Sequence, residues 1–294
     1  MKIIFFGTPD YVLPILTNLH KKFVTGPGIS PIVAVVTQSP KPTDRKRIIL
    51  YTPVDKWAHE REIPTFYKAG ELLKEDIVAD LGICAAYGEI IPKTVINSFK
   101  FGILNVHPSL LPKFRGASPI SAAIMAGDTQ TGVSIIKMDE KVDHGPIITQ
   151  FKEDISPNDT SETLRARLFE RSVDVLIELL EPYMKGRIRP KAQNDKEATF
   201  TKILTKQNGF IDMAKTPAEE AERFIRAMLP WPGAWTHIRL PSGGQARRIK
   251  LLKSHVVNGK LVLDEVQLEG KTPVSWRQFL MAYPESEFTG NNTG

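Results

Sequence analysis

Short apolar runs alternate with amphipathic segments through the first 185 residues of the chain. Runs of strand character lie at residues 3–6, 32–37, 80–87, 102–107, 132–138 and 146–151. Segments of helical character lie at residues 10–21, 53–61, 119–126 and 161–184. This alternation predicts an α/β fold in which a mostly parallel sheet carries helices on both faces. In such a sheet, the ligand site lies at the carboxyl ends of the strands.

The pattern changes at about residue 186, where the sequence becomes polar and rich in Lys, Arg and Pro. Beyond this stretch we expect a helix at residues 217–228, a rigid turn at 229–235, and strands at 235–240, 248–256 and 261–268. Short strands after one helix are typical of a small, barrel-like β domain of the OB type. We therefore predict an α/β domain at residues 1–188, a linker at 189–206 and a barrel-like domain at 207–294.

Composition places the chain among globular proteins, with 41% hydrophobic and 24% charged residues. No run approaches the ~20 apolar residues that a membrane span needs. The first residues enter a predicted strand directly, without the features of a signal peptide, and the single cysteine, Cys84, fits a reducing compartment. These observations favour a cytoplasmic protein that has no membrane partner.

The net charge becomes informative when the chain is divided. Residues 1–185 contain 22 Lys+Arg and 22 Asp+Glu, whereas residues 186–294 contain 17 and 11. The whole excess of +6 therefore lies in the last third of the chain. A basic appendage on a neutral body indicates a polyanionic partner, of which nucleic acid is the usual one. The alternative is an ordinary solvated surface.

The richest chemistry lies at residues 103–116, which read ILNVHPSLLPKFRG. Asn105 and His107 are two residues apart in a predicted strand, so they share one face and reach a loop that contains Pro108, Pro112 and Gly116. An amide donor beside an imidazole suits acyl transfer, in which an oxyanion forms and an amine loses a proton. For either residue alone, a turn or capping role is the alternative.

Two other segments suggest ligands less strongly. Gly7 begins a turn after the first predicted strand, but the turn lacks the further glycines and the acidic residue of a dinucleotide site, which argues against a nicotinamide cofactor. Residues 38–47, QSPKPTDRKR, form a predicted loop whose basic side chains are available for phosphates. That loop could equally be a solvated surface loop.

The chain resembles the methionyl-tRNA formyltransferases, a family of the folate-dependent formyltransferase superfamily, over nearly its whole length. In the first domain the resemblance rests on FGTP at residues 6–9, AYGEIIP at 86–92, NVHPSLLPKFRG at 105–116, AGD at 126–128 and DEKVDHGP at 139–146. Later it rests on ATFTK at 198–202 and IRAMLPWPGA at 225–234. The later segments discriminate, because formyltransferases that act on glycinamide ribonucleotide or amino sugars do not ordinarily carry them.

This resemblance implies a Rossmann-like formyltransferase fold and a specific reaction. The formyl group of 10-formyltetrahydrofolate would pass to the amino group of methionyl initiator tRNA, giving N-formylmethionyl-tRNA for translation initiation. Asn105, His107 and Asp143 would form the catalytic set. The Asn105 amide and a ring N–H of His107 would stabilise the oxyanion, and Asp143 would hold His107 or a proton-relaying water. No metal is implied, and Asp143 taken alone could be a turn residue.

The resemblance also implies a folate site. Its signature residues are Ser109, Leu110, Leu111 and Pro112, with the two leucines as an apolar wall for the flat pterin. The slot that holds the pterin would also be lined by backbone groups of Tyr87, Gly88, Glu89 and Ile90. We expect Arg115 to anchor the loop rather than to contact substrate.

The acceptor arm of the tRNA would bind the second domain through its phosphates. The candidate contact residues are Lys41, Arg45, Lys46, Arg47, Lys202, Lys206, Arg247, Arg248 and Lys250. Strand alternation predicts that Arg248 and Lys250 share one face and that Arg247 lies on the other. We expect the protein to be a monomer.

Several features depart from the family pattern. His144 replaces a residue that is usually small, Lys141 stands where glycine is common, and the last domain is shorter than usual. A shortened domain leaves a second reading, a formyltransferase that acts on an amino sugar nucleotide. A third reading is a non-catalytic folate- or RNA-binding protein, which would not need Asn105, His107 and Asp143 together.

Overall fold

The computed structural model describes residues 1–24, 26, 29–43, 48–75, 77–241, 243 and 245–289. The chain divides into two compact units. Unit 1 comprises Met1–Ala117, Thr131–Glu153 and Arg165–Phe200, and unit 2 comprises Ser118–Gln130, Asp154–Leu164 and Thr201–Gly294. None of the helices in the described ranges combines the length and apolar character that a membrane span requires.

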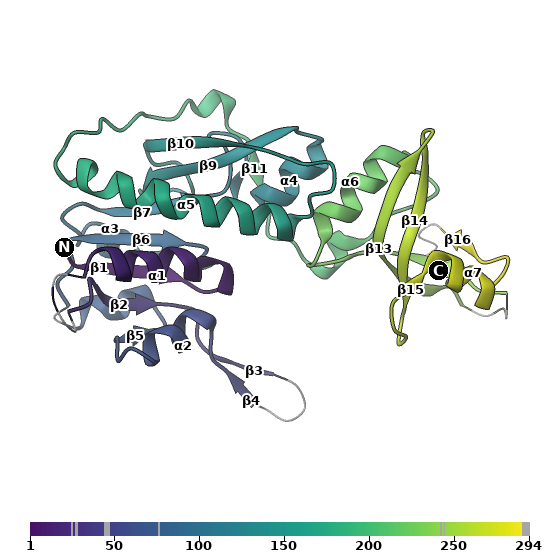
Figure 1. Ribbon diagram of the computed structural model, residues 1–294, viewed down its shortest axis with the longest axis horizontal. Coiled ribbons are helices and arrows are strands. Elements are labelled where there is room, and N and C mark those ends of the chain that lie inside the picture. Colours follow the sequence, from purple (N-terminus) through teal and green to yellow (C-terminus); the bar gives the residue numbers. More distant parts are fainter. Residues whose placement is uncertain are drawn as a thin grey trace. The chain divides into compact units, whose positions relative to one another are not determined.

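Unit 1 is built on a seven-stranded sheet with the strand order β10-β9-β7-β6-β1-β2-β5 (Figure 1). Neighbouring strands from β5 to β7 are parallel, and β9 runs antiparallel to β7. The predicted mostly parallel sheet is therefore confirmed. The strands are β1 (Ile3–Gly7), β2 (Ile32–Val36), β5 (Thr65–Phe66), β6 (Leu81–Ala85), β7 (Ile103–His107), β9 (Gln130–Lys137) and β10 (Ile147–Asp154).

Helices cover both faces of this sheet because its central strands are apolar on both sides. Ile4 and Phe6 of β1 point into a core that also holds residues of η2 and α3, while Ile3 and Phe5 point the other way and are equally buried. In Figure 1, α1 and α5 lie across the sheet. The helical segments are η1 (Asp10–Val12), α1 (Leu13–Lys22), α2 (Pro53–His59), η2 (Ala69–Leu73), α3 (Lys93–Ile96), α5 (Ser161–Met184) and η3 (Asp195–Glu197).

Two small sheets form where loops were expected. β3 (Lys41–Thr43) pairs antiparallel with β4 (Ile48–Leu50), so the expectation of a loop throughout residues 38–47 is wrong. These strands are only three residues long, and pairing rather than local pattern creates them. The second small sheet joins β8 (Arg115–Gly116) and β11 (Phe200–Thr201).

Unit 2 contains a five-stranded sheet with the order β15-β14-β13-β12-β16, in which the pairs are antiparallel. Helix α6 turns Ala221, Ile225 and Met228 inward onto this sheet, where Ile249 and Leu251 are also buried. The predicted small, mostly β second domain is confirmed. Its elements are α4 (Pro119–Ala126), η4 (Lys206–Gly209), α6 (Ala218–Met228), β12 (Ala234–Arg239), β13 (Arg247–Val257), β14 (Lys260–Leu268), β15 (Val274–Ser275), α7 (Trp276–Ala282) and β16 (Glu287–Thr289).

The core position of Cys84 on β6 gives a test of the fold. Its side chain is 7% exposed, and burial raises the pKa of the thiol to about 12. Because the thiolate is the reactive form, we expect the folded protein to resist Ellman's reagent at mildly alkaline pH. The denatured protein should react with one equivalent, since Cys84 is the only cysteine. Equally fast labelling of both forms would contradict this packing.

Candidate active site

Strand β7 delivers the two residues that the sequence singles out. Leu104 and Val106 are buried on one face of the strand, and Asn105 and His107 share the other face with the buried Ile103. Asn105 is half-buried and His107 is 4% exposed. Both side chains therefore have little freedom, as a reactive pair requires.

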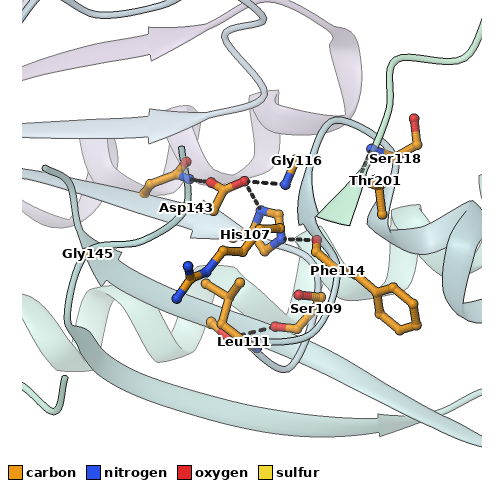
Figure 2. A network of polar contacts seen from close by, with 12 residues as sticks. His107, Ser109, Leu111, Phe114, Gly116, Ser118, Asp143, Gly145 and Thr201 are labelled. Atoms are coloured by element: carbon orange, nitrogen blue, oxygen red, sulfur yellow. Dashed lines mark hydrogen bonds and ion pairs between the residues drawn. The ribbon is translucent and has the colours of Figure 1, made fainter. Parts of the chain in front are cut away.

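The carboxylate of Asp143 accepts two hydrogen bonds and lies beside the ring of His107 (Figure 2). Oδ1 accepts a hydrogen bond from Asn105 Nδ2 at 3.1 Å, and Oδ2 accepts one from the Gly116 N–H at 2.8 Å. Oδ2 also lies 3.4 Å from Nδ1 of His107. The structure thus brings Asp143 of the 139–145 loop together with Asn105 and His107 of β7.

The second ring nitrogen of His107 defines the protonation of the imidazole. Nε2 lies 3.0 Å from the carbonyl oxygen of Phe114. A carbonyl only accepts hydrogen bonds, so Nε2 carries a proton. Nδ1 is then the ring atom that can take a second proton, and Asp143 stabilises the imidazolium that results. The Nε2–H points at Phe114 in this structure, so a His107 N–H donor to the oxyanion stays a prediction.

Asn105 has a donor beyond the one that holds Asp143. A side-chain amide carries two N–H groups, and one of them accounts for the bond to Asp143. The second is a donor that the bond to Asp143 does not use. The site therefore combines a neutral hydrogen-bond donor, the Asn105 amide, with a proton acceptor, His107. Asp143 balances the charge of His107 after it takes a proton. Acyl transfer needs a donor and a proton acceptor of this kind.

Ser134 on β9 fixes the loop that follows β7. Its hydroxyl donates to the Ser109 carbonyl at 2.6 Å and accepts from the Leu111 N–H at 2.9 Å. Gln150 on β10 donates to the same hydroxyl at 2.7 Å and to the Leu111 carbonyl at 3.0 Å. Sequence reasoning missed Ser134 and Gln150, because neither belongs to a local motif.

Of the four predicted folate-signature residues, two are buried inside the loop. Ser109 is fully buried and donates its hydroxyl to the Lys113 carbonyl at 2.7 Å, and Leu111 is 4% exposed. In this structure they support the loop from within. The other two, Leu110 and Pro112, are half-buried.

The loop of residues 139–145 holds Asp143 in an uncommon backbone conformation. Asp143 has φ of 48°, in the left-handed region that non-glycine residues rarely adopt. A Cβ atom at Gly145 would collide with the Lys137 carbonyl oxygen, so only glycine lets the loop pass so close to β9. Backbone strain of this kind is typical of functional sites.

Exposed apolar side chains lie on two segments that an ion pair joins. Lys93 Nζ and Glu140 Oε2 are 2.6 Å apart and link the start of α3 to the loop of residues 139–145. Ile90 is 86% exposed and Val142 is 62% exposed. Both apolar side chains are therefore open to solvent.

Of the residues predicted to line the pterin slot, one is buried and the others are exposed. Tyr87 is 2% exposed, its carbonyl accepts from Thr8 Oγ1 at 2.9 Å, and burial raises the pKa of its hydroxyl to about 12. Gly88 and Glu89 are exposed. Thr8 and Tyr87 follow β1 and β6, the adjacent strands at which the order of the sheet reverses, which is where ligands bind in such folds.

Lys141 and His144, the residues of the 139–145 loop that depart from the family pattern, contact carboxylates other than Asp143. His144 Nδ1 lies 2.6 Å from Asp139 Oδ2, and its Nε2 lies 3.4 Å from Asp195 Oδ2. A hydrogen bond from Arg115 lowers the pKa of the Asp195 carboxyl. Lys141 is exposed and its N–H donates to Asp139 at 2.9 Å. His144 therefore braces the loop from outside.

Arg115 anchors the loop, as the sequence suggested, and it does so through partners that the sequence did not indicate. It is 3% exposed, and its guanidinium bonds to Gln193 and Asp195. In the described part of the chain, no group of three or more His, Cys, Asp or Glu side chains could hold a metal ion.

Comparison with known proteins gives the family. The family model of formyl transferases matches residues 1–180, and that of the formyl transferase C-terminal domain matches residues 203–261. The methionyl-tRNA formyltransferase of Bartonella henselae is 37% identical over 263 residues, which cover 87% of this chain and 82% of that protein. The chain belongs to the methionyl-tRNA formyltransferase family.

Solved structures share the fold of this formyltransferase. The methionyl-tRNA formyltransferase from Clostridium thermocellum matches with a TM-score of 0.62 and 20% identity, over 91% of this chain and 98% of that one. WlaRD, a sugar 3N-formyl transferase solved in the presence of dTDP and 5-N-formyl-THF, matches with a TM-score of 0.63 and 17% identity, over 92% of this chain and 99% of that one. Enzymes with different acceptors thus share one fold.

Three of the predicted tRNA-contact residues in unit 2 adjoin Trp235. The guanidinium of Arg248 lies 3.8 Å from the centre of the Trp235 ring. The indole N–H of Trp235 donates a hydrogen bond to the Lys206 carbonyl at 3.0 Å. Lys250 is the cross-strand partner of Trp235, so the side chains of Trp235 and Lys250 share one face of the sheet. Arg247 pairs with the buried Ile238 and lies on the opposite face, as alternation predicted.

The remaining predicted contacts lie apart from this cluster in the chain. Lys41 is an exposed residue of β3 in unit 1, and Lys202 is an exposed residue of unit 2. Arg45, Lys46 and Arg47 lie outside the described residues.

Substitution of Asp143 tests the site geometry. In Asp143→Asn an amide replaces one acceptor oxygen, so one of the donors around Asp143 would face an N–H, and the charge that stabilises the His107 imidazolium is lost. We expect kcat for formyl transfer to fall by ~10²- to 10⁴-fold. Rapid-quench or steady-state assays of formyl incorporation measure this.

The matched control is Asp174→Asn, which changes an exposed carboxylate on α5. Its kcat should equal that of the wild type. An Asp143→Asn enzyme that keeps full kcat would refute the role of this carboxylate.

Proposed function

We propose that this enzyme transfers the formyl group of 10-formyltetrahydrofolate to the amino group of methionyl initiator tRNA, giving N-formylmethionyl-tRNA. The observation that carries the proposal is the contact set of Asn105, His107 and Asp143 at the end of β7, in a chain of the methionyl-tRNA formyltransferase family. Because the product serves translation initiation, we propose that the enzyme acts in the cytoplasm.

The reaction requires a proton acceptor and an oxyanion donor. The amine nitrogen attacks the formyl carbon, the carbonyl oxygen becomes negative, and the bond from the formyl carbon to the folate nitrogen then breaks. His107 would take the amine proton at Nδ1 and return it to the departing folate nitrogen, while Asp143 balances the charge. The second Asn105 N–H would bond to the oxyanion, a contribution of ~10²- to 10³-fold in rate.

The donor would bind beside the carboxyl ends of β1 and β6. The exposed Ile90 and Val142 support this assignment, because they offer apolar surface to a flat ring next to Asp143. The exposed backbone of Gly88 and Glu89 supplies polar groups at the same edge. In this arrangement Ile90 and Val142, rather than the buried Leu111, provide the apolar contact.

The acceptor arm would lie on the outer face of β12 and β13. Arg248 and Lys250 lie on this face, with the Arg248 guanidinium over the ring of the buried Trp235, and Lys206 follows at the carbonyl that accepts the indole N–H. A basic surface of this kind suits nucleic acid. We assign catalysis to the first domain, predicted at residues 1–188, and tRNA binding to residues 207–294, in a monomeric enzyme. Arg247 would contribute little, because it lies on the other face.

An acceptor comparison tests the reaction. We expect formyl transfer from 10-formyltetrahydrofolate to charged initiator tRNA, and much slower transfer to charged elongator tRNA. The measurement is radiolabelled formyl incorporation with each acceptor, and with an amino sugar nucleotide in parallel. Turnover with the amino sugar nucleotide alone would contradict the proposal and identify the protein as an amino sugar formyltransferase. Absence of turnover with all three would favour a non-catalytic binding protein.

A second prediction concerns the basic face. Lys250→Ala should weaken tRNA binding and lower the slope of log K against log salt by about 1, since it removes one phosphate contact. Binding is measured by filter retention over a salt series. Lys100→Ala, which removes an exposed lysine of unit 1, is the control. Equal slopes for Lys250→Ala and the wild type would exclude this contact.

A further inference from the structure

Residues 191–200, here called the strap, contact both loops that carry the proposed catalytic groups. Lys191 exchanges two backbone hydrogen bonds of 2.8 Å with Ile147, just beyond the 139–145 loop. Thr199 accepts the Arg115 N–H at 2.8 Å through its carbonyl and the Phe114 N–H at 2.8 Å through its hydroxyl. The strap, which sequence reasoning placed in the linker, therefore belongs to the packed structure of unit 1.

Gln193 binds the backbone on both sides of His144. Its Nε2 donates to the Asp143 carbonyl and to the Gly145 carbonyl, each at 2.8 Å. An amide nitrogen has two N–H groups, and these two bonds use both. Gln193 thus holds the backbone of the residue whose left-handed conformation aims the Asp143 carboxylate.

Arg115 fixes the orientation of the Gln193 amide. The Gln193 Oε1 accepts from Arg115 Nε at 3.1 Å and from Nη2 at 2.9 Å. A guanidinium only donates hydrogen bonds and a carbonyl only accepts them. If the Gln193 amide were flipped, its NH₂ group would face the Arg115 guanidinium and its oxygen would face the two backbone carbonyls, and all these bonds would be lost. Arg115 is 3% exposed and also bonds to Asp195 of the strap at 2.7 Å.

We propose that Gln193 is a positioning residue for Asp143. Gln193 acts through the backbone: it holds the carbonyls of Asp143 and Gly145, and thereby sets the distance from the carboxylate to His107 and Asn105. The role in catalysis rests on the proposed function. Displacements of about 1 Å at a reacting group cost up to ~10²-fold in rate, so the effect is measurable.

Two substitutions separate the donor from the acceptor side of the amide. Gln193→Met keeps the length of the side chain and removes both functions. Gln193→Glu keeps an acceptor for Arg115 and turns a carboxylate oxygen toward the two carbonyls. We expect both to lower kcat by ~10- to 100-fold, while KM for the folate and Kd for tRNA change little. Gln193→Glu provides a second test of the same role if the Gln193→Met variant folds poorly.

Asn194→Asp is the matched control, because it makes the same amide-to-acid change at the next residue. Asn194 is exposed, and its side chain contacts Lys196 and Glu197 within the strap rather than the catalytic loops. Its kcat should equal that of the wild type. Melting temperatures of all variants show whether a loss of kcat follows a loss of folded protein.

The ring nitrogen resonances of His107 provide a readout that does not need turnover. We expect Gln193→Met and Gln193→Glu to shift the titration of these resonances, because Asp143 moves relative to Nδ1, and Asn194→Asp to leave it unchanged. Unchanged kcat and an unchanged titration in both Gln193 variants would overturn the proposal. Should the wild type formylate no acceptor, the proposed function fails, yet the His107 titration still decides whether Gln193 positions Asp143.

Discussion

The active site depends on a single carboxylate that only accepts hydrogen bonds. Asp143 binds the Asn105 amide from β7 and the Gly116 N–H from the loop after it, and it faces Nδ1 of His107. Each donor comes from a different part of the chain, so the carboxylate determines how these parts lie. The left-handed backbone of Asp143 and the absence of a Cβ at Gly145 are conditions for placing it there.

The proposed chemistry and the proposed tRNA-binding surface lie in different units. The proposed proton acceptor, oxyanion donor and apolar folate contacts all belong to unit 1, whereas Trp235 and the cations around it belong to unit 2. A sugar 3N-formyl transferase shares the fold, so the fold alone does not select the acceptor. In the proposed function, the choice of tRNA as acceptor would rest on side chains such as Lys250 rather than on the architecture of the parallel sheet.

Sequence patterns predicted what depends on neighbouring residues. β1, β7 and α6 begin and end within two residues of their predicted limits, because each carries its own periodicity. Asn105 and His107 were found by their spacing at a strand end, and Asp143 by resemblance. β3 and β15 were missed, since strands of two or three residues exist only through their partners. Ser134, Gln150 and Gln193 were missed because isolated polar residues show their role only in three dimensions.

The close packing of the strap against unit 1 limits where the chain can be divided. A cut placed after residue 188, where the apolar pattern ends, would remove Gln193 and Thr199 from the protein that remains. The Arg115 side chain would lose its Gln193 and Asp195 partners and leave a buried cation without them. Domain exchange between relatives with different acceptors therefore calls for a junction after Phe200, so that the strap travels with the catalytic loops that it holds.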